Sequence, residues 1–375
     1  MKKGLFLLSA IVLLSVVIPT ASAEEAEPTI KKYLLETKDD LSYYAPLSLN
    51  GDTINLYPET KLTKNQAIKK FSKAYKFIED DLTDRGVAVD FDSGEFQDLV
   101  KTYFLIELDD KILEKEIHDF AAFMDFYENK AINDKIVSTI SNSVSSRSVA
   151  TEDVIADISA LLPSSTSSTL EVEPSNGQQP EITPFFYESN YAATYAKNWW
   201  NKTNNTLYPY YAEYYGQSTT NNNINDLPSG STGQSNPRRA WNDCTNFVSQ
   251  ALQNGGLATI KKGILNPAGD SDNWYYSDSK PSHTWGGAHN FYQHFSKRAG
   301  VASTSSVLGI GDAVSIDFTG DGSIDHTVII TKTTGTATNQ QYVTYHTYDT
   351  NQTKTLSDFY TGSAKVYGYE IDKIQ

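Results

Sequence analysis

Cysteine is nearly absent from this chain of 375 residues, in which Cys244 is the only one. A single thiol forms neither an internal disulfide nor a multi-thiolate zinc site, so neither can stabilise this fold. Runs rich in lysine and arginine are also missing, and 46 acidic side chains outnumber 31 basic ones. Because phosphate binding needs clustered cations, we expect no nucleic-acid partner. Cys244 is therefore either a packed core residue or a residue with a chemical task.

Long hydrophobic runs are scarce, and the clear one lies at the N-terminus. Lys2 and Lys3 precede an apolar run over residues 4–18, and Ala21-Ser22-Ala23 supplies small residues at a cleavage site. The run is shorter than the ~20 residues that span a bilayer. The pattern predicts a signal peptide over residues 1–23 and an exported chain that keeps no membrane segment after cleavage.

Acidity is concentrated in the first half of the mature chain. Residues 24–183 hold 31 acidic and 16 basic side chains, whereas residues 184–375 hold 15 and 13. Amphipathic helical patterns occupy residues 63–78, 96–106 and 111–140. The sequence thus predicts an acidic, mainly helical domain over residues 24–140, a flexible Ser/Thr/Pro-rich linker over 141–184, and a second domain over 185–375.

Cys244 lies in a segment with the pattern of a buried helix. Asn242 or Asp243 can cap it, an apolar stripe follows, and Gly255-Gly256 ends it. In the first helical turn, the macrodipole and the free N–H groups favour a thiolate. A small packed core residue accounts for Cys244 equally well when this segment is taken alone.

Two histidines are predicted on strands downstream. Residues 309–318, 325–331 and 341–348 are rich in β-branched residues and are separated by turn residues. Alternation puts His326 on one face of its strand and His346 on one face of the next. We expect the two imidazoles side by side at one end of an antiparallel sheet, where they can serve a nucleophilic cysteine.

Several of these motifs resemble one known family. The segments that carry the resemblance are residues 187–200, 243–252, 311–312, 325–328 and 345–347. Over residues ~185–372 the chain is similar to the bacterial putative amidase domain family, which is related to the NlpC and CHAP cell-wall peptidases. The resemblance implies a papain-like α+β domain with a helix-borne cysteine packed on an antiparallel sheet. It implies that Cys244 is the nucleophile, His326 the general base and His346 the residue that orients the base.

The expected activity is cysteine-dependent hydrolysis of amide bonds, with a peptide or peptidoglycan fragment as substrate and no cofactor. The Cys244 backbone N–H is the expected oxyanion donor, and the Asn242 and Asn246 side chains are further candidates. Asp349 is a second candidate for the orienting role. The alternative is a non-catalytic domain that keeps the fold and binds a cell-wall or surface partner.

Two other groups of residues have both a functional and a structural explanation. Trp274 and Trp285 could line a substrate cleft or pack in the core. Asp317, Asp321 and Asp325 match the early positions of a calcium loop, but a β-turn needs the same residues, and the turn is favoured. No metal site is expected.

Overall fold

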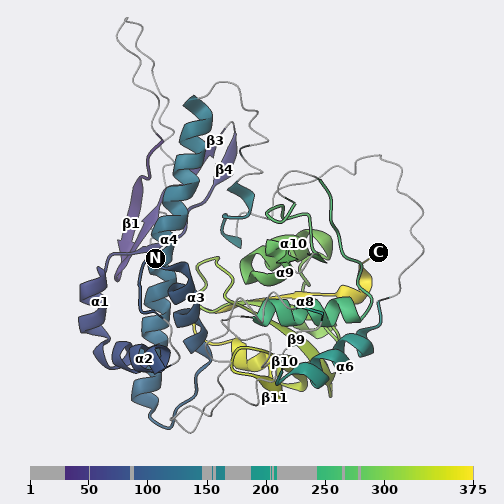
Figure 1. Cartoon of the computed structure of the whole chain (residues 1–375). Helices are drawn as coiled ribbons and strands as arrows, with labels where there is room; N and C mark the ends of the chain where they lie inside the picture. Colours follow the sequence, from purple (N-terminus) through teal and green to yellow (C-terminus); the bar gives the residue numbers. More distant parts are fainter. Residues whose placement is uncertain are drawn as a thin grey trace, which may run out of the picture.

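The computed structural model of the chain describes residues 30–374 except for 50, 85–87, 146–153, 155–157, 165–186, 203, 205–206, 209–242, 264–266 and 278–279. These residues form an α+β molecule. The N-terminal part, residues 30–145, packs beside a C-terminal part, residues 187–374, that is built around a five-stranded antiparallel sheet (Figure 1). The predicted signal peptide and Asn242 lie outside the described residues.

The N-terminal part is mainly helical and also contains short strands. Its helices are α1 (Lys64–Lys70), α2 (Ser72–Asp84), α3 (Gly94–Thr102), the 3₁₀ turn η1 (Tyr103–Leu105) and α4 (Lys111–Ser145). Its strands are β1 (Leu34–Lys38), β2 (Leu41–Tyr44), β3 (Leu47–Leu49), β4 (Asp52–Ile54) and β5 (Glu59–Thr60). The single helix predicted over residues 63–78 is divided at Phe71, while Thr63 and Gln66 form a capping box at its start.

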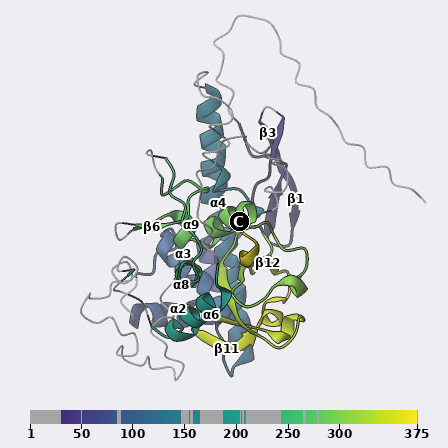
Figure 2. The same ribbon diagram turned by 90° about the vertical axis from the view of Figure 1, so that its right-hand side faces the viewer.

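Aromatic side chains fill the core between α2, α3 and α4. Phe91 lies within 6.0 Å, between ring centroids, of both Phe96 and Phe120, and Phe120 stacks on Phe123 at 5.8 Å. The C-terminal end of α4 packs against the β3–β4 hairpin in a separate apolar cluster that includes Ile136 (Figure 2). The hydrophobic periodicity of the sequence thus predicts helices in these three regions, although the first region holds two helices instead of one.

In the C-terminal part, a short antiparallel pair of strands, β6 (Tyr276–Ser277) and β7 (Lys280–Pro281), precedes the main antiparallel sheet, whose order is β11-β10-β9-β8-β12. Its strands are β8 (Ala313–Asp317), β9 (His326–Thr333), β10 (Gln341–Tyr345), β11 (Thr350–Thr355) and β12 (Lys365–Tyr369). Its helices are α6 (Ser189–Trp199), α8 (Cys244–Asn254), α9 (His283–Gly286) and α10 (Ala288–Arg298). The predicted antiparallel strands are confirmed, and β11 and β12 extend the sheet.

Strand pairing decides which side chains share a face of this sheet. His326 lies opposite Ile316 where β9 pairs with β8. Val343 lies opposite Ile330 where β10 pairs with β9, after an irregularity between Tyr342 and Val343. Directly opposed residues point to the same face. His326, Ile330 and Val343 therefore share one face, which we call the far face.

Helices α6 and α8 cover the other face, which we call the helix face. Thr245 of α8 is hydrogen bonded to Thr327 of β9, and Ile329 joins the apolar core beneath α6 and α8. The far face has its own core of Leu308, Val314, Ile316, Val328, Ile330, Val343, Tyr345, Leu356 and Phe359. Side chains on the two faces are separated by the sheet itself.

The two parts of the molecule are joined by polar contacts and by an aromatic pair. Asn129 Nδ2 donates to Asp321 Oδ2 at 2.7 Å, and Thr319 Oγ1 donates to Asp125 Oδ2 at 2.6 Å. Phe104 packs on Phe318 with ring centroids 4.9 Å apart. Helix α4 thus contacts the loop between β8 and β9 directly.

Part of the predicted flexible linker is packed against the C-terminal part. The Ser164 N–H donates to the carbonyl of Gly322 at 2.9 Å, and the Ser164 carbonyl accepts from the Tyr292 hydroxyl at 3.0 Å. Gln293 of α10 donates to the carbonyl of Leu162 at 3.1 Å. A Ser/Thr/Pro-rich composition predicted a segment free of such contacts, and the described residues 158–164 do not follow that prediction.

Candidate functional site

Cys244 is the first residue of α8, and only 2% of its surface is exposed. Its Sγ lies 3.6 Å from Thr245 Oγ1, and that hydroxyl lies 2.9 Å from Thr327 Oγ1 on β9. N–H groups in the first turn of a helix have no intrahelical acceptor and carry partial positive charge. Cys244 therefore lies at the positive end of a helix, on the helix face of the sheet.

His346 lies just after β10 and bridges three elements. Its Nδ1 is 3.0 Å from Asp243 Oδ2, and its Nε2 is 2.8 Å from the carbonyl oxygen of Trp199 at the end of α6. Its ring stacks on Phe247 with the centroids 4.0 Å apart. Since Asp243 precedes Cys244 and Phe247 lies one turn further along α8, the imidazole is held beside the helix end that carries the thiol.

The hydrogen bonds of His346 favour its cationic form. The carbonyl of Trp199 can only accept, so Nε2 carries a proton, and the Asp243 carboxylate favours a second proton on Nδ1. Burial alone lowers the pKa of His346, but attraction to Asp243 and, to a smaller extent, to Asp349 outweighs burial and raises this pKa above its ordinary value of 6.5. A buried imidazolium and carboxylate thus lie next to Cys244.

The thiol of Cys244 is in its neutral form in this arrangement. Burial raises its pKa from 9.0 to about 11, and the hydrogen bond with Thr245 offsets burial only in part. This direction opposes the stabilisation of a thiolate by the helix end. Burial outweighs the helix end because the sulfur has almost no contact with solvent. The thiolate must therefore be generated before Cys244 can act as a nucleophile.

His326 lies on the far face, so the expected placement of the two imidazoles side by side is wrong. Its ring centroid is 4.9 Å from that of Tyr345, 6.1 Å from that of Phe318 and 6.2 Å from that of Phe359. Its Nε2 is buried and has no hydrogen-bond partner among the described residues. Burial lowers the pKa of His326 to about 3, so its imidazole is neutral.

The turn after His346 has an uncommon backbone. Thr347 and Tyr348 have φ values of 67° and 61°, in the left-handed region that β-branched and aromatic residues rarely adopt. Strain of this kind costs of order 1–3 kcal/mol per residue and is concentrated at functional sites. His346 and Asp349 flank these two residues, so the strained turn fixes both with respect to the end of α8.

Asn246, Trp274 and Trp285, which were also candidates for the site, make hydrogen bonds within the core. Asn246 Oδ1 accepts from Trp285 Nε1 at 3.0 Å and from Gln250 Nε2 at 3.0 Å. Trp274 Nε1 donates to Ser249 Oγ at 3.1 Å, and neither Trp274 nor Trp285 has any exposed surface. Of the two explanations left open for Trp274 and Trp285, packing in the core is the one observed, because both rings lie in the core beneath α8.

The carboxylates of the suggested calcium loop bind backbone and side-chain donors. Asp317 accepts from the N–H groups of Gly320 and Gly322, and Asp325 accepts from the N–H of Phe318 at 2.9 Å. These bonds close the turn between β8 and β9, as the favoured interpretation expected. Within the described ranges no group of three His, Cys, Asp or Glu side chains has the arrangement of metal ligands.

Asp243 is the site residue that the sequence did not reveal. The sequence offered it only as one of two possible helix caps, with Asn242 as the other. It occupies the cap position but makes no side-chain capping bond and turns its carboxylate to His346. The Trp199 carbonyl contact could not be predicted either, since backbone contacts between distant segments leave no pattern in side-chain types. The position of an acidic residue directly before Cys244 was the signal available.

Residues 186–369 match the model of a family described as a putative amidase domain. A curated relative, the uncharacterized protein YhbB of Bacillus subtilis (strain 168), is 33% identical over 113 aligned residues, and the match covers 28% of this chain and 34% of that protein. The chain thus covers about a third of the length of this relative. No solved structure matches. The family match supports an amidase domain in the C-terminal part and suggests amide hydrolysis. Separately, no helix within the described ranges is long and apolar enough to span a bilayer.

Proposed function

We propose that the C-terminal part is a papain-like cysteine amidase or peptidase that hydrolyses amide bonds in cell-wall peptide. One observation carries this proposal. The imidazole of His346 is held at the N-terminus of α8 by Asp243 and Phe247, the residues on either side of Cys244 along that helix end. A cysteine at a helix end beside an imidazole paired with a carboxylate is the combination that acyl transfer needs.

In the proposed reaction Cys244 attacks the amide carbonyl as a thiolate, and its backbone N–H stabilises the oxyanion. His346, protonated on both nitrogens, gives its Nε2 proton to the departing amine, which leaves a thioester on Cys244 and a neutral imidazole. The imidazole then takes a proton from water while the oxygen of that water attacks the thioester carbonyl. Release of the carboxylic acid restores the thiolate and the imidazolium.

The first step requires two changes at the site. The Nε2 of His346 must leave the carbonyl of Trp199 to reach the leaving amine. The thiol, whose pKa is raised to about 11 by burial, must lose its proton to solvent water, because His346 already carries a proton on each nitrogen and cannot accept another. A movement of His346 toward Cys244 serves both needs, because a nearby imidazolium stabilises the thiolate. Asp243 keeps the ring charged while it moves.

His346 is assigned as the acid and base because it shares the helix face with Cys244, whereas His326 packs on the far face. The family resemblance implied these roles for His326. The neutral imidazole of His326, with a buried and unpartnered Nε2, has the protonation state of a base but is separated from α8 by the sheet.

The second candidate function is binding without catalysis, and the neutral, buried thiol favours it. In that case Cys244 is a packed residue, and the N-terminus of α8 only stabilises the fold. The two candidates differ in whether removal of the sulfur abolishes hydrolysis or lowers stability.

The test compares the chain with its Cys244→Ala and Cys244→Ser variants on purified peptidoglycan fragments, with product masses as the readout. We expect new amine and carboxyl products from the chain and none from either variant. The thermal midpoints of the variants should stay within a few degrees of the parent, since each loses only one small group. Equal product formation by Cys244→Ala would exclude the cysteine mechanism. If neither the parent nor the variants release products but the parent binds the same fragments, the result supports the second candidate function, binding without catalysis.

We also propose that the chain is exported, on the basis of residues 1–23. The mature protein recovered from the culture medium or the wall of cells that produce it should begin near Glu24, which N-terminal sequencing determines. A chain that begins at Met1 in the cytoplasm would contradict export without bearing on the chemistry.

A further inference from the structure

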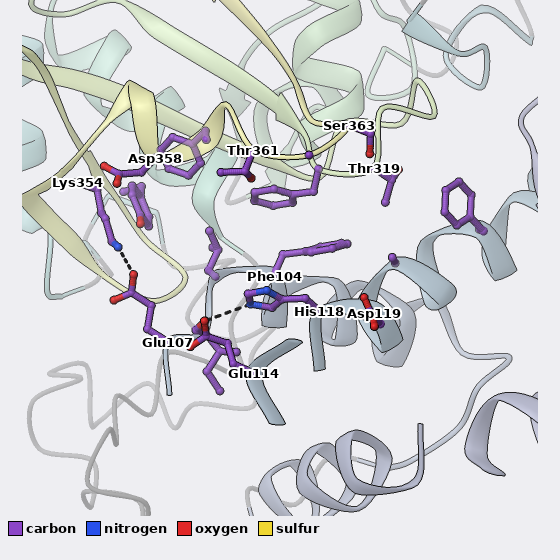
Figure 3. Close-up of a pocket in the computed structure, with 18 residues that line it drawn as sticks. Phe104, Glu107, Glu114, His118, Asp119, Thr319, Lys354, Asp358, Thr361 and Ser363 are labelled. Carbon is purple, nitrogen blue, oxygen red and sulfur yellow. Dashed lines mark hydrogen bonds and ion pairs between the residues drawn. The ribbon is translucent and has the colours of Figure 1, made fainter. Parts of the chain in front are cut away.

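A cavity of about 510 Å³ lies between the N-terminal and C-terminal parts (Figure 3). We call it the junction cleft. Helix α4 and the segment before it supply one wall. The loop after β8, the end of β10 and the residues between β11 and β12 supply most of the other, and Thr319 and Ser363 face His118 and Asp119 across the cavity. An ion pair between Lys354 and Glu107 connects the two walls at one end. The cleft therefore exists only when both parts are present.

The junction cleft is separate from the proposed reaction site. Tyr345 and Phe359, which line it, belong to the core of the far face, and both contact the ring of His326. Cys244 and His346 lie on the helix face, on the other side of the sheet. Nothing in amide hydrolysis at Cys244 accounts for a cleft in this position.

Carboxylates outnumber cations in the lining of the cleft. Its acidic residues are Glu107, Glu114, Asp119 and Asp358, and Lys354 is its one lysine. Glu114 and Asp119 also pair with Lys111 and Lys115, whose side chains are 70% and 75% exposed. Pairs with such exposed lysines are weak. The bonds of Asp358 come from the N–H and hydroxyl of Thr355, and no cation of the described residues pairs with it. The lining favours a positively charged ligand.

Aromatic rings supply the apolar part of the lining. Phe104 from the N-terminal part and Phe318 from the C-terminal part pack at a centroid distance of 4.9 Å, and Phe126 and Phe359 also line the cleft. Such rings bury the methylene groups of an aliphatic chain and attract a cation at its end. The hydroxyls of Thr319, Thr361 and Ser363 can hydrogen bond to peptide groups.

We propose that the junction cleft binds a short peptide that carries a primary ammonium group on an aliphatic side chain. The ammonium lies among the carboxylates, the methylenes lie against the rings of Phe104 and Phe318, and the hydroxyls of the C-terminal wall contact the peptide backbone. A volume of about 510 Å³ is in the range of sites for ligands of this size. The site does not depend on catalysis at Cys244.

The test measures binding by calorimetry with the full chain carrying Cys244→Ala, so that no peptide is cut. Two probes differ in the terminal ammonium group, acetyl-Ala-Lys-Ala-amide and the same peptide with norleucine, which ends at the fourth side-chain carbon, in place of lysine. We expect the lysine peptide to bind about tenfold more tightly, a difference of about 1.4 kcal/mol. Raising the salt concentration should weaken the lysine peptide more than the norleucine peptide, because the difference is electrostatic.

Variants locate the site. Asp119→Asn combined with Asp358→Asn keeps the shape of both side chains and should remove most of the preference for lysine. Asp272→Asn is the matched control, because Asp272 is an exposed carboxylate of the C-terminal part that pairs with Lys297 outside the cleft. Phe318→Leu should weaken both peptides several-fold and reports on the aromatic wall independently. Equal binding of the two peptides, no binding of either, or an equal loss in Asp272→Asn would overturn the proposal.

Discussion

His346 and Asp243 form a buried pair in which Nδ1 lies 3.0 Å from Oδ2, and neither side chain has more than 3% of its surface exposed. The two residues are 103 positions apart in the sequence, so the pair joins the end of β10 to the start of α8. A pair of this kind in a dry environment is stable only when both members are present, since either one alone would be a buried, uncompensated charge. The pair therefore links the geometry of the proposed site to the stability of the fold.

Replacement of Asp243 should change stability in a pH-dependent way. The pKa of His346 is raised in the folded chain, so its proton contributes stability below the unfolded pKa of about 6.5, and this contribution is lost as pH rises through the folded pKa. Asp243→Asn should therefore destabilise the chain by about 1.5–3 kcal/mol near pH 5.5 and by less at pH 8.5. Thermal unfolding at both pH values measures this difference. A loss that is the same at both would show that the charge of His346 is not involved.

Activity should distinguish the two histidines. His346→Gln removes the proposed proton donor and acceptor, and general acid and base groups contribute about 10²–10⁴-fold to rates. We expect a loss in kcat in that range for His346→Gln and less than about tenfold for His326→Gln. His283→Gln, an exposed histidine of the same part, is the matched control and should leave kcat unchanged. A larger loss of kcat in His326→Gln than in His346→Gln would instead assign the acid and base role to His326, and it would contradict the assignment that rests on the faces of the sheet.

The sequence predicted the strands that carry these histidines but not the faces on which they lie. Within β9 and within β10, the predicted alternation of side chains between the two faces of the sheet was correct for each strand taken alone. The irregularity between Tyr342 and Val343 sets the register between them, and a shift of one residue moves every side chain to the other face. Side-chain alternation carries no signal of such an irregularity. His326 and His346 were consequently placed together when the sheet separates them.

A similar limit applies to the tryptophans and to the linker. The bands of aromatic residues around Trp274 and Trp285 fit a cleft and a core equally well until the hydrogen bonds to Ser249 and Asn246 are known. The helices and the antiparallel sheet could be predicted because each depends on local periodicity. The contacts of Leu162 and Ser164 with α10 depend on pairing between distant segments, which composition does not encode.

The contact between the two parts should weaken as pH rises. Burial raises the pKa of Asp125 well above 3.8, the nearby Asp321 and Asp325 raise it further, and Lys101 only partly opposes them. The folded chain therefore holds this proton more tightly, and the resulting stability is lost as pH rises from about 4 toward the folded pKa. Asp125→Asn keeps an oxygen for the Thr319 hydroxyl and should be more stable than the parent by about 1 kcal/mol or more at pH 7.5. In thermal unfolding near pH 4, the stabilities of the parent and of Asp125→Asn should become equal. Asp109→Asn, which replaces an exposed carboxylate, is the control. A difference in stability between the parent and Asp125→Asn that persists at pH 4 would contradict this account.

Asn246 should prove to be a packing residue rather than an oxyanion donor. Its Oδ1 accepts from Trp285 Nε1 and from Gln250 Nε2, so Asn246→Ala leaves two buried donors without their acceptor and should destabilise the chain by about 1–3 kcal/mol. Asn198→Ala, on the exposed side of α6, is the matched control and should change stability by less than about 0.5 kcal/mol. Removal of an oxyanion donor instead costs about 10²–10³-fold in kcat. The two roles are separated by measuring the stability of Asn246→Ala and its kcat at a temperature where the variant is fully folded. A kcat within a few fold of the parent supports packing. A hundredfold loss of kcat with little change in stability would restore Asn246 to the catalytic site.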